Sequence, residues 1–404
     1  MNSNRSDRRS FLKSSVVTAA AGAWSWALPA RAARGQSGST APRRPPRLRF
    51  AVIGLNHGHI YSQVEAALAG GGELVSFHAR EPDLVEAFTK RHPQAKLARD
   101  ERDILEDPSI QLVVSASIPN ERAPLGINVM RHGKDFMVDK PGMTTLDQLA
   151  DVRRVQAETK RIYSVLYSER HENRATVKAG ELVKAGAIGK IIQTVGLGPH
   201  RMTPRTRPDW FFERERYGGI LCDIASHQFD QFLFFTGSTR ADVLASQVGN
   251  VHHPQYPGFE DFGDVMLRGD GGSGYIRVDW FTPDGLQTWG DTRLTVLGSD
   301  GYIEVRKNID ITGRPGSNHL FLVDQKETRY IDTSDTPLPY GERLMDDVLN
   351  RTETSMPQAH VFLVMELALK AEKQALRIGG RGADGMHNAQ CTMHNAECTG
   401  TVDG

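Results

Sequence analysis

The chain has 404 residues, which is too long for one ordinary hydrophobic core and long enough for two domains. Lysine plus arginine and aspartate plus glutamate balance at 49 each, so no net charge favours nucleic acid or an acidic membrane surface as a partner. With 39% hydrophobic residues the composition is that of a globular protein, and only three cysteines occur, which excludes a disulfide framework as the support of the fold.

The N-terminal segment is typical of an export signal. Asp7-Arg8-Arg9-Ser10-Phe11-Leu12-Lys13 precedes an Ala- and Ser-rich run over 14–28 that is too short and too polar to span a membrane comfortably. It resembles a twin-arginine signal cleaved after about Ala32, although Asp7 stands where Ser or Thr is usual. We expect residues 1–32 to be this signal, 33–47 to be a linker, and the mature protein to be periplasmic or secreted; a disordered basic tail is the alternative.

A nucleotide site is predicted next. A short apolar strand over 48–54 ends in a glycine turn, and residues 60–69 have the apolar spacing of a helix, whose free N-terminal amides attract phosphate. The dinucleotide fingerprint Gly-x-Gly-x-x-Gly is only partly present, because Asn56 and His59 replace its second and third glycines. Asparagine tolerates a left-handed backbone, so the loop is retained as a candidate. Its cofactor-binding candidates are Gly54, Asn56, His57, Gly58 and His59.

The following segments alternate between strand and helix, as in an open parallel sheet. Strands are predicted over 73–78, 112–116 and 135–138, and helices over 83–90 and 125–131. Such a sheet binds its ligand at the carboxyl ends of its strands. We therefore expect a doubly wound Rossmann domain over 48–168. The turns after the later strands add Ser117, Pro119, Asn120, Asp139 and Lys140 to the cofactor-binding candidates.

The residue that ends the second strand distinguishes the two nicotinamide cofactors. An acid there accepts hydrogen bonds from the ribose 2′-hydroxyl of NAD, whereas an arginine accommodates the 2′-phosphate of NADP. This position is Ala79, followed by Arg80. The sequence therefore favours NADP, with NAD as the second choice.

Two further motifs carry chemistry. Val138-Asp139-Lys140-Pro141 offers a lysine, and Gly218-Gly219 precedes Asp223 and His227, which stand four residues apart, one helical turn, and so would share a face. A histidine with an acidic neighbour is suited to moving a proton. Both motifs, in this order, resemble those of the Gfo/Idh/MocA oxidoreductase family over about 48–378. The resemblance implies that Lys140 lies between nicotinamide and substrate, that Asp223 holds a substrate hydroxyl, and that His227 accepts the proton. The chain departs from the family pattern at Ala123 and Ala225.

The second domain is expected over 169–380. Alternating apolar segments at 191–195, 264–267, 274–280 and 294–297 are separated by Gly/Asp turns, and family members carry a large, mostly antiparallel open sheet there. An exposed sheet face needs covering, so we expect a homodimer or homotetramer. Aromatic faces beside planar polar groups suit sugars. The candidate substrate-binding residues are His200, Arg201, Trp210, Trp289 and Asp291.

We thus expect an exported NAD(P)-dependent oxidoreductase that takes hydride from a carbohydrate hydroxyl and keeps its cofactor bound. Two alternatives remain: a redox-neutral glycosidase, lyase or epimerase that uses transient oxidation, and a non-catalytic carbohydrate-binding protein. No metal ion, nucleic-acid partner or membrane span is expected in the mature form. Residues 381–404 contain a duplicated heptapeptide with Cys391 and Cys398; a disordered tail is expected, with metal chelation or a disulfide as alternatives.

Overall fold

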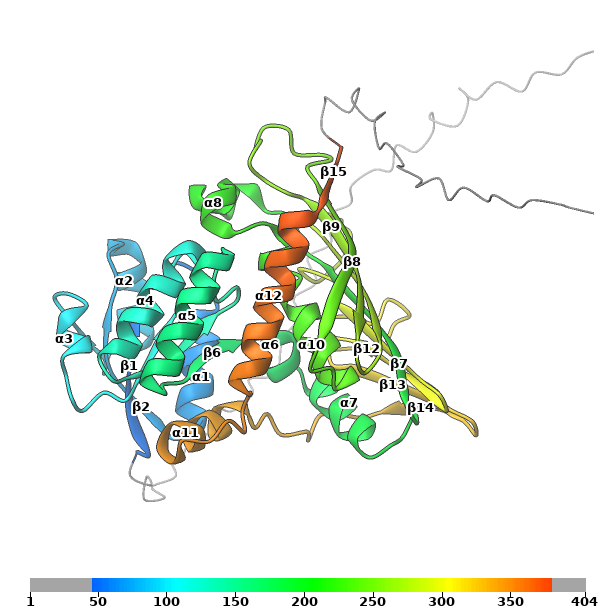
Figure 1. Ribbon diagram of the computed structural model, residues 1–404, viewed down its shortest axis with the longest axis horizontal. Coiled ribbons are helices and arrows are strands. Elements are labelled where there is room, and N and C mark those ends of the chain that lie inside the picture. Colours follow the sequence, from blue (N-terminus) through cyan, green and yellow to red (C-terminus); the bar gives the residue numbers. More distant parts are fainter. Residues whose placement is uncertain (1–45, 380–404) are drawn as a thin grey trace, which may run out of the picture. The chain divides into compact units, whose positions relative to one another are not determined.

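The computed structural model describes residues 46–379, which contain two β-sheets and the helices around them (Figure 1). The predicted export signal, almost all of the linker and the duplicated tail lie outside the described residues. Within the part of the chain that is described, no helix is both long enough and apolar enough to cross a bilayer.

The first sheet has six parallel strands in the order β3-β2-β1-β4-β5-β6. This is the order of a dinucleotide-binding Rossmann fold, as predicted. The three strands β4 to β6 are buried along their whole length, because helices cover both faces of the sheet. The strands are β1 (Leu48–Ile53), β2 (Gly72–His78), β3 (Lys96–Leu97), β4 (Leu112–Ser115), β5 (Asp135–Asp139) and β6 (Tyr163–Leu166).

Five helices accompany this sheet: α1 (Ile60–Ala69), α2 (Pro82–Arg91), α3 (Arg102–Leu105), α4 (Pro119–Arg131) and α5 (Leu146–Thr159). Helix α4 begins six residues before the predicted start at Leu125, so Pro119 and Asn120 lie in its first turn. Pro124 disfavours helix, which explains why the predicted helix begins only after it. Gly126 is needed because a Cβ there would collide with the rings of Tyr163 and Phe136.

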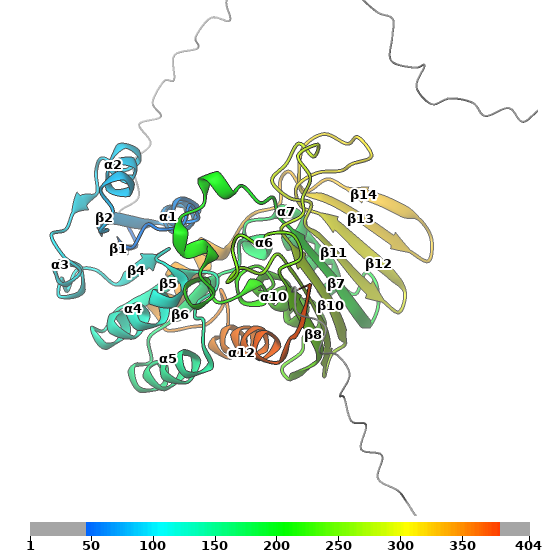
Figure 2. The ribbon, with the colours of Figure 1, turned by 90° about the horizontal axis from the view of Figure 1, so that it is seen from above.

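The second sheet has nine strands in the order β14-β13-β12-β11-β7-β10-β9-β8-β15 (Figure 2). Neighbouring strands are antiparallel except for the pairs β7–β10 and β8–β15, so the prediction of a large, mostly antiparallel sheet is confirmed. The strands are β7 (Ile191–Pro199), β8 (Ala241–Gly249), β9 (Phe262–Gly269), β10 (Ser273–Asp279), β11 (Arg293–Gly298), β12 (Gly301–Arg306), β13 (His319–Asp324), β14 (Thr328–Ile331) and β15 (Leu376–Ile378).

Short helices between β7 and β8 carry the second predicted motif. They are the 3-10 turns η1 (Pro204–Thr206) and η2 (Asp209–Phe212), then α8 (Arg214–Tyr217), α9 (Ile220–Asp223) and α10 (Ser226–Thr236). Helix α8 contacts α4 of the first sheet, and α10 packs on β7 and β10 of the second. The segment therefore lies between the two sheets, as Figure 2 shows.

The remaining helices are α6 (Ser168–His171), α7 (Arg174–Lys184), α11 (Tyr340–Asn350) and α12 (Gln358–Gln374). Helix α11 packs against α1, and its Tyr340, Leu344 and Met345 belong to the same apolar core as the first sheet. Helix α12 contacts α5 and β6 on one side and β8 and α10 on the other. The chain thus returns to the Rossmann half after the second sheet, and a single cut at residue 168 does not separate the two halves.

Candidate active site

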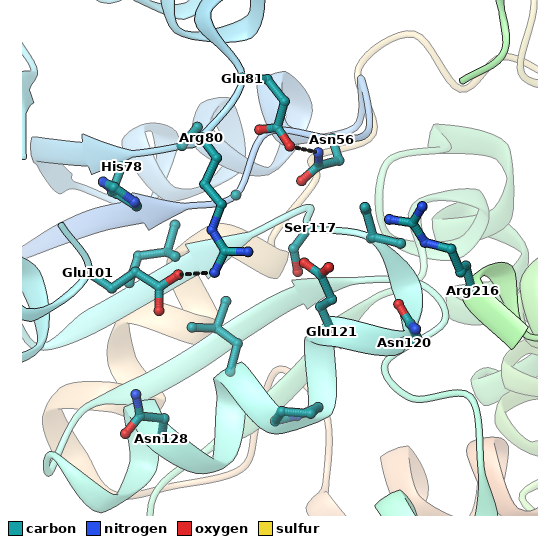
Figure 3. Close-up of a pocket in the computed structure, with 16 residues that line it drawn as sticks. Asn56, His78, Arg80, Glu81, Glu101, Ser117, Asn120, Glu121, Asn128 and Arg216 are labelled. Carbon is teal, nitrogen blue, oxygen red and sulfur yellow. Dashed lines mark hydrogen bonds and ion pairs between the residues drawn. The ribbon is translucent and has the colours of Figure 1, made fainter. Parts of the chain in front are cut away.

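A cleft of about 630 Å³ opens at the carboxyl ends of the parallel strands (Figure 3). Ligands of open parallel sheets bind at this edge, where the strand order reverses between β1 and β4. Five predicted cofactor-binding residues line the cleft, namely Gly54, Asn56, Arg80, Ser117 and Asn120. The lining does not include the other predicted cofactor contacts, which are His57, Gly58, His59, Pro119, Asp139 and Lys140.

Gly54 directly follows β1 and lies against the turn that follows β4. Its φ is +84°, and a Cβ at this position would lie 2.7 Å from Cβ of Ser117. The amide of Ala116 also donates to the carbonyl of Gly54 at 3.2 Å. A larger residue would therefore push the two loops apart, and the glycine keeps the backbone close to whatever the cleft binds.

The rest of the fingerprint loop is held by side chains in place of the missing glycines. Nδ2 of Asn56 donates to Oε1 of Glu81 at 2.7 Å, which ties the loop to the start of α2. A Cβ on Gly58 would meet nothing within 4 Å, so the loop is open there. No side chain caps the N-terminus of α1, whose N-cap residue is His59. The cleft thus lies where a Rossmann fold binds its dinucleotide, and the amides of His57, Ile60 and Tyr61 already donate to the carbonyls of Ala116, His57 and Gly58.

The end of β2 has the arrangement that the sequence predicted. Ala79 and Arg80 line the cleft directly after His78, so no acid occupies the ribose position. The guanidinium of Arg80 is largely exposed and reaches Glu101 at 3.4 Å. Arg216 of α8 lines the same cleft from the opposite side and was not predicted (Figure 3).

The Asp139-Lys140-Pro141 loop is fixed by a buried arginine that sequence analysis missed. Nη1 of Arg122 donates to the carbonyls of Asp139 at 3.1 Å and Pro141 at 3.0 Å, and also to that of Lys140. Its Nη2 donates to Oδ2 of Asp139 at 3.1 Å, and its Nε donates to the carbonyl of Ser117 at 2.7 Å. One guanidinium therefore joins the turns that follow β4 and β5. Nothing in the helical pattern of 119–131 distinguishes Arg122 from a surface arginine.

Asp139 also contacts the fingerprint loop. Nδ1 of His59 lies 2.9 Å from its Oδ1, and Nδ1 of His57 lies 3.4 Å from its Oδ2. Burial alone would raise the pKa of Asp139, but the charges of His59 and Arg122 outweigh burial and hold this pKa well below its usual range. Among the described residues these three side chains form the only His/Cys/Asp/Glu group that converges as metal ligands do. The carboxylate is already neutralised by Arg122, so we assign the group to holding the loops together.

Lys140 and Asp223 meet between the two sheets, although 83 residues separate them in the chain. Nζ of Lys140 lies 2.7 Å from Oδ1 of Asp223, and the two side chains are only 6% and 14% exposed. Lys140 follows β5 directly, and Asp223 is the last residue of α9. The structure therefore brings together the two motifs that sequence analysis picked out.

The glycine pair before α9 determines where Asp223 lies. Gly218 and Gly219 have φ values of +93° and +95°, and a Cβ on Gly219 would collide with the carboxyl group of Glu372. That carboxyl accepts from the amide of Leu221 at 3.0 Å, and Glu260 accepts from the amide of Ile220 at 2.9 Å. The two carboxyl groups satisfy the first amides of the helix. Burial and the neighbouring Glu260 raise the pKa of Glu372 to about 8.

Asp223 and His227 do not lie on one continuous helix, which corrects the predicted one-turn pairing. Helix α9 ends at Asp223 and α10 begins at Ser226. At this joint the amide of His227 donates to the carbonyl of Ile224 at 3.2 Å, and the Asp223 carbonyl accepts from the Ser226 hydroxyl at 3.0 Å. The Asp223 carboxylate is bonded to Lys140.

His227 is a buried, neutral imidazole. Its side chain is almost completely enclosed, and its Nδ1 has no hydrogen-bond partner among residues 46–379. Burial lowers the pKa of His227 to about 3, with Lys140 acting in the same direction and Glu169 opposing it. Glu169 was not predicted; its Oε2 accepts from Nζ of Lys307 at 2.6 Å and from Nε2 of Gln228 at 2.9 Å. The imidazole is therefore unprotonated at physiological pH.

Two of the predicted substrate residues gather near this centre. The ring of His200 lies 4.6 Å from that of Trp289 and 5.3 Å from that of Trp280. Burial lowers the pKa of His200 to about 4. The charge of Glu169 raises this pKa and the charge of Lys140 lowers it, so both charges act on His200. Trp289 is 50% exposed and presents an open aromatic face.

The other three predicted substrate residues have structural partners. Trp210 is 8% exposed and packs in the apolar core beside Phe211, so its ring does not offer an open face to a sugar. Arg201 donates to the carbonyls of Pro283, at 2.9 Å, and Leu286, and thereby holds the loop after β10. The carboxylate of Asp291 accepts from Nε of Arg293 at 3.0 Å.

Comparisons with known proteins agree with this geometry. Residues 48–167 match the family model described as the oxidoreductase family with an NAD-binding Rossmann fold, and residues 176–304 match the GFO/IDH/MocA C-terminal domain. The first match contains all six strands of the parallel sheet, and the second covers the second sheet from β7 into β12.

A solved structure from Erwinia carotovora atroseptica SCRI1043, described as an oxidoreductase without a stated substrate, is 46% identical, with a TM-score of 0.80 over 82% of this chain and 99% of that one. The scyllo-inositol 2-dehydrogenase (NAD(+)) of Bacillus subtilis is 24% identical over 69% of this chain and 80% of its own length. The levoglucosan dehydrogenase of Pseudarthrobacter phenanthrenivorans is 25% identical over 70% and 77%. The chain belongs to the Gfo/Idh/MocA family and is an NAD(P)-dependent oxidoreductase.

Proposed function

We propose that the protein oxidises a hydroxyl group of a sugar or cyclic polyol, with a nicotinamide dinucleotide as the hydride acceptor. The observation that carries the proposal is the buried Lys140–Asp223 pair beside the neutral His227. The names of the two curated relatives, which act on an inositol and an anhydrosugar, point to the same class of substrate. The bound cofactor would supply hydride acceptance, and the side chains would supply the proton chemistry.

The roles of the three residues follow from their surroundings. A carbinol loses its hydroxyl proton as its carbon becomes a carbonyl, and the neutral imidazole of His227 would accept that proton. The charge that His227 then gains is offset by Glu169, whose carboxylate already acts on it. The ammonium of Lys140, oriented by Asp223, would stabilise negative charge on the substrate oxygen.

The cofactor that we propose is NADP. Ala79 removes the acid that would repel a 2′-phosphate, and Arg80 provides a cation at the same edge of the cleft. Gly54 keeps the loop close to the ligand, and Arg216 adds a second cation across the cleft. These features support a tightly held dinucleotide.

We further propose that residues 1–32 direct the folded, cofactor-loaded protein out of the cytoplasm. A supply of free NADP is not expected outside the cell, so retention of the cofactor would be needed for turnover there. The test is to denature protein purified from the exported fraction and to identify any released nucleotide by mass spectrometry. Stoichiometric NADP supports the proposal; protein that is empty and binds neither dinucleotide would contradict it.

We also propose self-association through the open face of the nine-stranded sheet. Met266 pairs across the ladder with Tyr275, and Leu297 pairs with Tyr302. Met266, Leu297 and Tyr302 are exposed by 54%, 40% and 39%, so this face carries apolar side chains in solvent. Light scattering on the wild type and on Met266→Glu tests the proposal: a monomeric wild-type protein would contradict it.

A further inference from the structure

Arg207 is a cation held firmly in place without a carboxylate partner. It follows η1, and its guanidinium carbon lies 4.6 Å from the ring centre of Phe211 and 5.0 Å from that of Trp280. Its Nε is buried, and this atom has no hydrogen-bond partner within residues 46–379. The two rings support the guanidinium by cation–π contact but do not use its hydrogen-bond donors.

Arg207 lies on the substrate side of the site. The ring centre of Trp280 lies 5.0 Å from the guanidinium carbon of Arg207 and 5.3 Å from the ring centre of His200, so one aromatic ring contacts both side chains. Burial lowers the pKa of Arg207, and Asp223 is the charged group that opposes this effect. Arg207 is not among the residues that line the cofactor cleft. Its position is therefore beside the proposed reaction centre and away from the dinucleotide.

The charges around the centre leave Arg207 unneutralised. Lys140 is paired with Asp223 at 2.7 Å, and Lys307 is paired with Glu169 at 2.6 Å. His227 and His200 are uncharged near neutral pH, because burial holds their pKa values at about 3 and about 4. No carboxylate of the described residues lies within ion-pair distance of Arg207, and Asp223, the acid that acts on it, is already bonded to Lys140. The centre therefore carries one positive charge in excess.

We infer that the substrate is a sugar acid, whose carboxylate binds the Arg207 guanidinium while one of its hydroxyls is oxidised at His227. This inference rests on the proposed function and narrows its substrate class. The N–H groups of a planar guanidinium match the two oxygens of a carboxylate. A guanidinium that is partly withdrawn from water binds such a partner in preference to water. A single unpaired cation suits a singly charged carboxylate better than a doubly charged phosphate ester.

The test compares each sugar acid with its neutral parent. D-glucuronate and D-galacturonate are assayed beside D-glucose and D-galactose, with the reduced cofactor followed by absorbance and kcat/KM determined for each. We expect the acids to be favoured by about 10- to 100-fold, the range of one charge-assisted hydrogen bond. In Arg207→Met this preference should fall close to one, mainly through KM, and Arg207→Lys should restore part of it. Arg205→Met, an exposed arginine two residues earlier, is the matched control and should keep the wild-type preference.

A second readout separates this inference from the proposed function. Titration of D-glucuronate and D-glucose into cofactor-loaded protein by calorimetry measures binding without turnover. If the protein oxidises the neutral sugars and kcat/KM for the acids is equal or lower, the inference is overturned. The proposed function is then still supported. An equal loss for acids and neutral sugars in Arg207→Met overturns the inference too. Protein that binds NADP but neither binds nor oxidises any of the four sugars contradicts the inference, and it contradicts the proposed function as well when cyclic polyols are not oxidised either.

Discussion

Nζ of Lys140 and Oδ1 of Asp223 lie 2.7 Å apart, and this one ion pair joins the end of the parallel sheet to the helix that follows the Gly218-Gly219 pair. Both partners are largely withdrawn from water, so removal of either leaves a charge without compensation. The relationship explains why two short motifs far apart in the chain form one centre. It also predicts that Lys140 cannot be replaced without loss of catalysis.

In Lys140→Ala we expect kcat/KM to fall by on the order of 100- to 10,000-fold, because the cation that stabilises charge on the substrate oxygen is lost. His227→Ala should cause a loss of similar size through the missing proton acceptor. Steady-state kinetics with the sugars above measure both effects. Lys178→Ala is the control, since Lys178 is a partly exposed residue of α7 whose pair with Glu181 contributes little. Turnover near the wild-type level in either site variant would show that the assigned roles are wrong.

Arg122→Met should destabilise the fold as well as the site. The buried guanidinium satisfies the carbonyls of the 139–141 turn and of Ser117 and donates to the Asp139 carboxylate. We expect the free energy of unfolding to fall by about 3 kcal/mol, the usual cost of breaking a buried pair. Urea unfolding measures the change, with Arg131→Met on the exposed end of the same helix as control. A loss below about 1 kcal/mol would contradict a structural role.

Much of the fold could be predicted because alternation of strand and helix, and apolar runs of strand length, depend on local sequence. The parallel order follows from the right-handed crossovers that such a sequence permits. The break between α9 and α10 could not be predicted, since Asp223 and His227 have the spacing of one turn and the joint is set by tertiary contacts. The packing of α11 in the core of the first sheet could not be predicted either, because it also depends on tertiary contacts.

Site residues that belong to a local sequence motif were predicted, and those that act only through long-range contacts were missed. Gly54, Lys140, Asp223 and the glycine pair stand in recognisable patterns. Arg122, Glu169 and Arg216 act through long-range contacts that no local pattern records. Trp210 illustrates the opposite error. An aromatic residue in a polar loop has the same local sequence whether its ring contacts a ligand or packs into the core, and the ring of Trp210 packs into the core.

Acid should destabilise the protein through its buried histidines. Burial holds the pKa of His227 at about 3 and that of His200 at about 4, below the unfolded value of 6.5. Between these values the unfolded chain binds more protons than the folded chain. The contribution of the two histidines to the free energy of unfolding is therefore fully present above pH 6.5 and is lost as the pH falls towards 4.

The slope should approach about 1.4 kcal/mol per pH unit for each such histidine. Urea unfolding at pH 7.5, 6.0 and 5.0 measures it, and His200→Gln should lower the slope by nearly one histidine's share. His132→Gln is the control, because His132 is exposed. A titration of the His227 imidazole by NMR with a midpoint near 6.5 in the folded protein would contradict the burial argument.

Cofactor preference should depend on two neighbouring residues at the end of β2. Ala79→Asp would place a carboxylate directly at the end of β2, in addition to Glu81 and Glu101, which already line the cleft. We expect it to weaken NADP binding relative to NAD by at least about 10-fold, since like charges would face each other at the 2′-phosphate. Arg80→Met should shift the ratio in the same direction by removing the cation, and its effect should shrink at high salt because the side chain is exposed. Arg99→Met, another exposed arginine, is the control.

Dissociation constants for both cofactors are measured from quenching of protein fluorescence. A wild-type protein that binds NAD tightly and NADP weakly would contradict the assignment of NADP. An unchanged ratio of the two constants in both variants would show that Ala79 and Arg80 do not determine the preference.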